Sequence, residues 1–145
     1  MTNERAIEAL LYEYAERLDR GDFAGVGALF RDGTFGGRDN PRRHGAAAVQ
    51  AALETLVRRH DDGTPRTKHV TTNVRIAVDA TAGTASASSY FTVLQQTATL
   101  PLQTIAAGRY SDRFVCADGT WRFAERVIDM DLVGDLREHL LPRRP

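Results

Sequence analysis

Two side chains of this sequence, Asp19 and His69, are of the types that proton-transfer chemistry needs. Histidine titrates near neutral pH, so an imidazole in a pocket can act as a general base. A carboxylate hydrogen-bonded to that imidazole would fix its tautomer and stabilise its protonated form. If the two side chains meet, such a pair could remove a proton from a carbon acid.

His69 opens a segment in which polar and apolar residues alternate, as in a β-strand with two different faces. One predicted face holds His69, Thr71, Asn73 and Arg75. The opposite face holds Val70, Val74 and Ile76. The polar face either meets solvent or lines a pocket roofed by helices, and the alternation alone favours neither.

Asp19 ends a helical segment and borders its apolar stripe, which runs through Leu11 and Ala15. The helix dipole disfavours a carboxylate at this end, so Asp19 is slightly misplaced for stability alone. It is either a solvated helix-end carboxylate or a partner for a histidine. Asp22 is better explained as the N-cap of the next helix.

Five further residues are candidates for substrate binding. Tyr14, Phe35, Tyr90 and Trp121 could line a pocket, although core packing also explains Tyr14. Arg126 could meet an anionic group of the substrate, or pair with Asp19 or Glu125.

No other cluster indicates chemistry. His44, His60 and His139 are expected at the surface, and Cys116 is interpreted as structural. The four histidines are too scattered to predict a metal site, and the sequence has no glycine-rich phosphate loop. We therefore expect no metal and no cofactor.

The elements that must position these residues follow in a simple order. Helical periodicity predicts a first helix that ends at Gly21. A short second helix is predicted over residues 23–30, and a third from Gly45 to about Arg59. Long strands joined by short turns follow from His69 to Asp131, and residues 135–141 could add a short helix. Helices followed by strands predict an α+β domain. A curved, mostly antiparallel sheet closed by the helices would form a cone with an interior pocket.

Length and charge limit the alternatives. The 145 residues, 42% hydrophobic, suit one domain over residues 1–145. Nineteen basic and nineteen acidic residues cancel, which argues against a strongly basic nucleic-acid binder or a polybasic membrane anchor. Without a long apolar stretch or a signal-peptide core, we expect a cytoplasmic protein whose partner is a small molecule.

The chain also resembles a known family. The segment from Tyr14 to Asp22 (YAERLDRGD) resembles the opening of SnoaL-like proteins, which belong to the NTF2-like superfamily. The stretch HVTTN at residues 69–73 resembles their matching strand. The stretches GRYSD (108–112) and DGTWRF (118–123), with Arg126, resemble their final hairpin. The resemblance implies a cone-shaped α+β barrel over nearly the whole chain.

Within that superfamily the chain is similar to scytalone dehydratase and hexachlorocyclohexane dehydrochlorinase, which use a histidine base and an aspartate. The resemblance places those roles on His69 and Asp19. The tyrosine that precedes the dehydratase aspartate is Leu18 here, and its second histidine has no counterpart in the strand from Ser86 to Tyr90. The ketosteroid isomerase base would fall near Gly37, so isomerase chemistry of that type is not expected.

Two functions remain at this point. The first is a cofactor-independent acid–base enzyme, a dehydratase or related lyase, cyclase or isomerase, acting on a small, mainly apolar molecule. The second is a non-catalytic binding or assembly subunit, such as a protein similar to the β subunits of ring-hydroxylating dioxygenases. In either case relatives pair through the outer face of the sheet, so a homodimer or homotrimer is expected.

Overall fold

The computed structural model describes residues 1–142 and has the expected order of helices followed by strands. The helices are α1 (Asn3–Asp19), α2 (Phe23–Leu29) and α3 (Ala46–Leu56). The strands are β1 (Thr34–Gly37), β2 (Arg43–His44), β3 (Thr67–Asp79), β4 (Thr84–Gln95), β5 (Gln103–Ala117) and β6 (Thr120–Val133). The predicted fold class, α+β, is therefore confirmed.

Two of the three helices, α1 and α2, begin at a capping side chain. Thr2 accepts a hydrogen bond from the backbone N–H of Arg5 at the start of α1, and Asp22 accepts one from Gly25 at the start of α2. The predicted cap at Asp22 is thus confirmed. The third helix ends at Leu56, three residues before the expected end, because the chain becomes extended at Val57.

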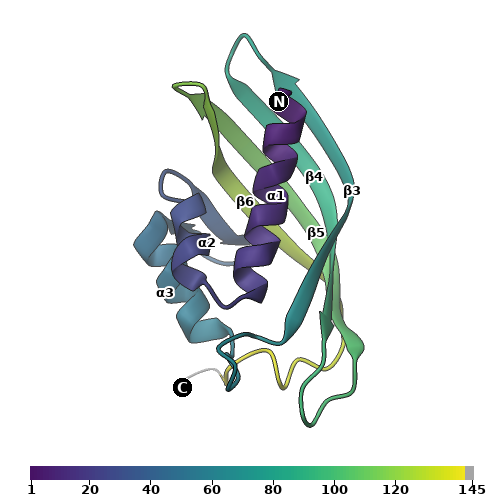
Figure 1. The fold of residues 1–145 in the computed structure, drawn as a ribbon. Helices are drawn as coiled ribbons and strands as arrows, with labels where there is room; N and C mark the ends of the chain where they lie inside the picture. The colour runs from purple at the N-terminus through teal and green to yellow at the C-terminus, as the bar shows by residue number, and fades with distance from the viewer. Residues whose placement is uncertain (143–145) are drawn as a thin grey trace.

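The six strands form one curved sheet in the order β2-β1-β6-β5-β4-β3. The four long strands pair antiparallel with their neighbours, but β1 runs parallel to β6, so the sheet is mixed. The sheet does not close on itself, which corrects the expectation of a barrel. Figure 1 shows α1 lying along one face of the sheet, with α2 and α3 beside the end of α1 that leads into α2.

A β-bulge in β3 reverses part of the predicted face assignment. The register shifts between Thr72 and Arg75, where Asn73 adopts a positive φ of 53°. The extra residue turns Val74, Ile76 and Val78 to the same side as His69. Val70 points outward instead, so the expectation that it shares a face with Val74 and Ile76 is wrong.

A second bulge has the same effect in β6. Arg113 pairs with Glu125, whereas Phe114 pairs with Phe123, so Ala124 is the additional residue. Trp121 and Phe123 are buried before the bulge, and Arg126 is buried after it. A regular strand alternation would put Arg122, Ala124 and Arg126 on one face, and the bulge removes that arrangement.

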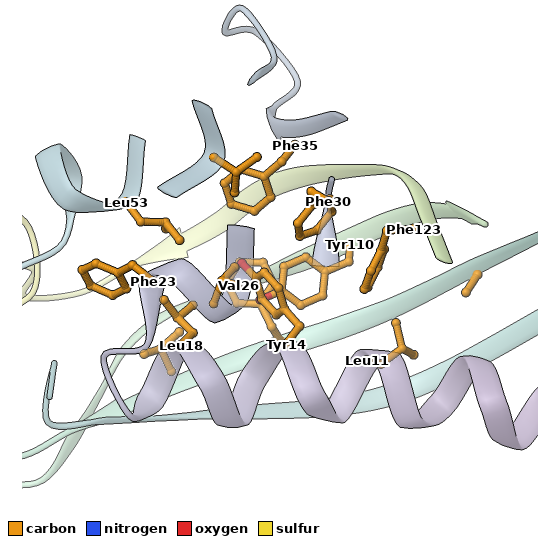
Figure 2. Packing of buried hydrophobic residues seen from close by; sticks show 14 of the residues in the cluster. Leu11, Tyr14, Leu18, Phe23, Val26, Phe30, Phe35, Leu53, Tyr110 and Phe123 are labelled. Atoms are coloured by element: carbon orange, nitrogen blue, oxygen red, sulfur yellow. The ribbon is translucent and has the colours of Figure 1, made fainter. Parts of the chain in front are cut away.

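The core fills the space between α1 and the concave side of the sheet. Figure 2 shows aromatic rings from the helices and strands meeting there, among them Tyr14, Phe30, Phe35 and Tyr110. The Phe30 ring stacks on Phe123, with centroids 4.7 Å apart, and Tyr14 meets Tyr110 edge-on at 5.8 Å. The interior pocket expected from the sequence is thus occupied by these side chains.

The segment after β6, residues 134–142, crosses the end of the molecule as an extended strap (Figure 1, yellow). It contains turns and one isolated β-bridge, between Leu140 and Val57, so the predicted tail helix is wrong. Hydrogen bonds from Arg58 N–H to the His139 carbonyl and from Leu141 N–H to the Leu56 carbonyl hold it in place. No helix among residues 1–142 is long and apolar enough to cross a membrane.

Candidate functional site

Asp19 and His69, fifty residues apart in the chain, meet where α1 ends and β3 begins. Their side chains lie 2.6 Å apart, measured from His69 Nδ1 to Asp19 Oδ1. A carboxylate can only accept, so Nδ1 carries the hydrogen, and in the neutral ring Nε2 is the nitrogen that holds the lone pair. This is the arrangement of an imidazole prepared to accept a proton at Nε2.

The Asp19 carboxylate is itself fixed by β3. Its Oδ1 accepts a hydrogen bond of 2.9 Å from the Thr67 hydroxyl, and its Oδ2 accepts one of 2.8 Å from the backbone N–H of His69. Together with the imidazole, three donors from one strand hold the two carboxylate oxygens. These hydrogen bonds from outside α1 offset the unfavourable interaction between the Asp19 carboxylate and the negative end of the helix dipole.

The pair is mostly shielded from solvent but not sealed. The side chain of His69 is 7% exposed and that of Asp19 is 11% exposed. Both border a hollow of about 380 Å³, which is also lined by Ala15, Glu16, Arg20 and Lys68. A small organic molecule fits such a volume, and the charged side chains at its edge face solvent.

The five residues predicted to bind substrate do not line this hollow. Tyr14, Phe35 and Trp121 are buried in the core, and the Trp121 indole donates to the Asn3 side chain over 3.1 Å. Tyr90 lies on the opposite, outer face of the sheet and is 51% exposed. The structure therefore brings Asp19 to His69 but keeps these four aromatic residues away from the hollow.

Arg126, the fifth, belongs to a separate buried cluster. It forms two hydrogen bonds with Asp112, so the predicted pairing with Asp19 or Glu125 is wrong. The rings of Tyr14 and Tyr110 lie 4.2 and 3.7 Å from its guanidinium carbon. Burial raises the pKa of Tyr14 and raises that of Tyr110 further, so both phenols stay protonated.

A second imidazole lies beside His69. His139 belongs to the strap and was expected at the surface, but its residue is only 9% exposed; its ring centroid lies 6.2 Å from that of His69. Burial, and then the charge of His69, lower the pKa of His139 to about 4. His44 is exposed as expected, and His60 is half-buried with Nε2 donating to the Glu138 carbonyl.

Three residues near these sites, Thr67, Asp112 and His139, were not predicted to belong to them. Thr67 stands two residues before His69, and the period of two in a strand places both on one face. Asp112 lies midway between Tyr110 and Phe114, so the same period puts it on the core face. Nothing in the sequence near His139 indicates that its segment folds back onto β3.

The comparisons with known proteins agree with this architecture. The family model described as a SnoaL-like domain matches residues 1–127. The chain belongs to the SnoaL-like family. No match to this SnoaL-like protein is found among curated proteins.

Solved structures share the fold of this SnoaL-like domain. A candidate scytalone dehydratase from Novosphingobium aromaticivorans is 26% identical with a TM-score of 0.72, covering 91% of this chain and 86% of that one. Rv3472 from Mycobacterium tuberculosis, a protein of unknown function, is 27% identical with a TM-score of 0.70. The match covers 87% of this chain and 74% of that one. LinA is 17% identical with a TM-score of 0.71, and the match covers 97% of this chain and 94% of that one. This likeness shows a common fold.

Proposed function

We propose that this SnoaL-like protein is a cofactor-independent acid–base enzyme acting on a small, mainly apolar organic molecule. His69 would remove a proton from carbon through Nε2, and Asp19 would orient the imidazole and stabilise its protonated form. Loss of a leaving group from the neighbouring carbon would make the enzyme a dehydratase or related lyase. Cyclisation or isomerisation would begin with the same proton transfer.

The observation that carries this proposal is the 2.6 Å contact between His69 Nδ1 and Asp19 Oδ1 at the wall of a hollow. Two further donors, from Thr67 and from the His69 backbone, point the carboxylate at the ring. A surface histidine needs no such support. The likeness to a candidate scytalone dehydratase is consistent with elimination as the reaction class.

The test uses 5-nitrobenzisoxazole, a probe whose ring opens to a coloured phenolate when a base removes its carbon-bound proton. His69→Asn and Asp19→Asn should each slow this reaction by roughly 10²- to 10⁴-fold, the usual contribution of general acid–base catalysis. Asp22→Asn is the matched control, because asparagine also caps a helix and Asp22 serves α2 alone. If wild type and His69→Asn open the probe equally fast, the proposal is wrong.

The alternative is a non-catalytic small-molecule-binding or assembly subunit, similar to a dioxygenase β subunit. The filled interior favours it, since Tyr14, Phe35 and Arg126 occupy the place where an interior pocket was expected. In that case Asp19 and His69 are a hydrogen-bonded structural pair. Replacing either one would then lower stability but leave the probe reaction at its background rate in every variant.

A further inference from the structure

The wall of the hollow beside His69 carries several charged side chains. Glu16, Arg20 and Lys68 line it and are exposed to solvent, and Ala15 is its apolar part. A pocket for a purely apolar molecule would be lined mostly by apolar and aromatic side chains. The charged lining therefore indicates a substrate that carries a charge of its own.

The sign of that charge follows from the groups that already have partners. The Asp19 carboxylate is held by three donors of β3. Arg20 and Lys68 form no ion pair within residues 1–142, although most of the arginines there do. Even Glu16, one helical turn before Arg20, lies beyond ion-pair distance from it. Two unpaired cations against one unpaired carboxylate leave the hollow with an excess positive charge.

We propose that this hollow binds a substrate carboxylate through Arg20 and Lys68, so that the enzyme acts on a small organic acid. This inference rests on the proposed function and narrows its substrate to a molecule with an anionic end. A guanidinium can bind a carboxylate through two parallel hydrogen bonds, and an ammonium adds a second positive charge. The rest of the acid would lie beside His69, which lines the same hollow of about 380 Å³.

The two cations are the direct neighbours of the Asp19–His69 pair in the chain. Arg20 follows Asp19 at the end of α1, and Lys68 precedes His69 in β3. Neighbours in a strand normally point to opposite faces. Lys68 still lines the hollow because β3 is the last strand of the sheet, and a long side chain can bend around an edge that no further strand covers. The contact between Asp19 and His69 therefore brings the cations to one place as well.

The Nε2 atom of His69 is accessible to a molecule held in this way. It bonds to no group of residues 1–142, and it is not one of the buried atoms that lack a partner. A carboxylate bound by the cations fixes one end of the substrate, so its C–H can be presented to Nε2 in one orientation. The cations would thus act on binding, and His69 would act on the proton.

The experiment uses two further probes that open by the same reaction, 1,2-benzisoxazole-5-carboxylate and its uncharged 5-carboxamide. The two molecules have nearly the same shape and differ in charge. Arg20→Gln and Lys68→Gln should each raise KM for the carboxylate by roughly two- to fivefold, the scale of one exposed ion pair, and leave kcat nearly unchanged. KM for the carboxamide should stay at the wild-type value, because this probe carries no charge.

Glu16→Gln should change KM in the opposite direction. Removing this carboxylate from the wall of the hollow removes a repulsion, so KM for the carboxylate probe should fall by a similar factor. Arg75→Gln is the matched control, because Arg75 is an exposed arginine of β3 that forms no ion pair within residues 1–142 and does not line the hollow. It removes the same charge from the protein, and KM for both probes should match wild type.

Lys68 allows binding to be measured without turnover, because it is the only lysine of the chain. In His69→Asn, the ¹³C NMR signal of the Lys68 Cε carbon should shift and saturate as the carboxylate probe is added. The carboxamide should leave the signal in place. Adding Arg20→Gln to this variant should weaken the response to the carboxylate.

KM values for the carboxylate that stay at wild type in Arg20→Gln and Lys68→Gln would overturn the carboxylate site. Changes of equal size for both probes, or in Arg75→Gln, would do the same, as would a Lys68 signal that responds equally to both. If the Lys68 signal responds to the carboxylate alone but His69→Asn turns over the probes as fast as wild type, the proposed function fails and the anion site stands. The two failures are therefore distinguishable.

Discussion

Arg126 and Asp112 form an ion pair in which neither side chain has any exposed surface. Two hydrogen bonds join them, Nε to Oδ1 at 2.8 Å and Nη2 to Oδ2 at 2.9 Å. Burial alone would lower the pKa of Arg126, but Asp112 more than offsets it and the pKa is raised. The pair is thus a charged connection between β5 and β6 inside an aromatic core.

Asp112→Asn should strongly destabilise the protein, because it leaves the Arg126 charge buried without its counter-ion. Breaking a buried pair from one side costs about 3–5 kcal/mol. Urea unfolding followed by the fluorescence of Trp121 would measure the change. Asp131→Asn is the matched control: Asp131 also pairs with an arginine, Arg109, but at the exposed side of the same two strands.

A free energy of unfolding that changes as little in Asp112→Asn as in Asp131→Asn would contradict this assignment. It would mean that solvent or another group compensates Arg126 in the variant. Exposed pairs contribute little because water screens both charges, so the contrast between the two variants should be large.

The order of the main elements could be predicted from the sequence, but the face of the sheet to which each strand residue points could be predicted only in part. Helical periodicity and turn residues predicted the three helices and the long strands in the correct order, and motif resemblance predicted the family. The bulges beside Asn73 and at Ala124 were missed because each inserts one residue into an alternation that otherwise looks regular. Asn73 was the available signal, since asparagine tolerates a positive φ better than most residues.

The candidate site could be predicted in part. Asp19 and His69 meet, as the motif positions implied. Sequence could not place Arg126, because its partner Asp112 lies on a neighbouring strand and the intervening bulge sets which face it takes. The position of His139 beside His69 could not be predicted for a related reason. It depends on a strap held by backbone hydrogen bonds, which no side-chain pattern encodes.

The lowered pKa of His139 predicts a pH-dependent contribution to stability. Below pH 6.5 the unfolded chain binds a proton at this ring, whereas the folded protein does so only near pH 4. The contribution is therefore present above pH 6.5 and is lost as the pH falls through about 4. The difference between the pKa of His139 in the unfolded chain and in the folded protein corresponds to about 3 kcal/mol of unfolding free energy.

The measurement is the free energy of unfolding of wild type and His139→Gln between pH 7 and pH 4. The difference in unfolding free energy between wild type and His139→Gln should shrink as the pH falls over this range. Taking this difference removes the effect of carboxylates that titrate alike in both proteins. His44→Gln serves as the control, since His44 is exposed. A wild-type advantage that stays constant with pH would show that His139 titrates alike in both states.

Thr67→Val tests whether the Thr67 hydroxyl holds the Asp19 carboxylate in place. Valine keeps the shape of the side chain but removes the 2.9 Å hydrogen bond to Asp19. Hydrogen bonds to charged groups contribute about 1.5–3 kcal/mol, so the free energy of unfolding should fall by this amount. The probe reaction should slow, but less than in Asp19→Asn, because the His69 backbone N–H still holds the other oxygen.

Thr71→Val provides the comparison for this substitution. Thr71 lies on the same strand and face, but its hydroxyl is not bonded to Asp19. Its rate on the probe should match wild type. Equal rates for Thr67→Val and wild type would show that the imidazole and the backbone N–H of His69 are enough to orient the carboxylate.

The outer face of the sheet supports the proposal of a homodimer or homotrimer. Tyr90 and Val70 are exposed there, on adjacent strands, where the sheet has no helix over it (Figure 1). Apolar side chains gathered on a strand surface favour association. Light scattering after size exclusion should therefore give two or three times the chain mass, and Tyr90→Glu should reduce it to that of one chain. Tyr12→Glu, at a half-exposed tyrosine of α1, should leave the assembly unchanged; a wild-type mass of one chain would contradict the proposal.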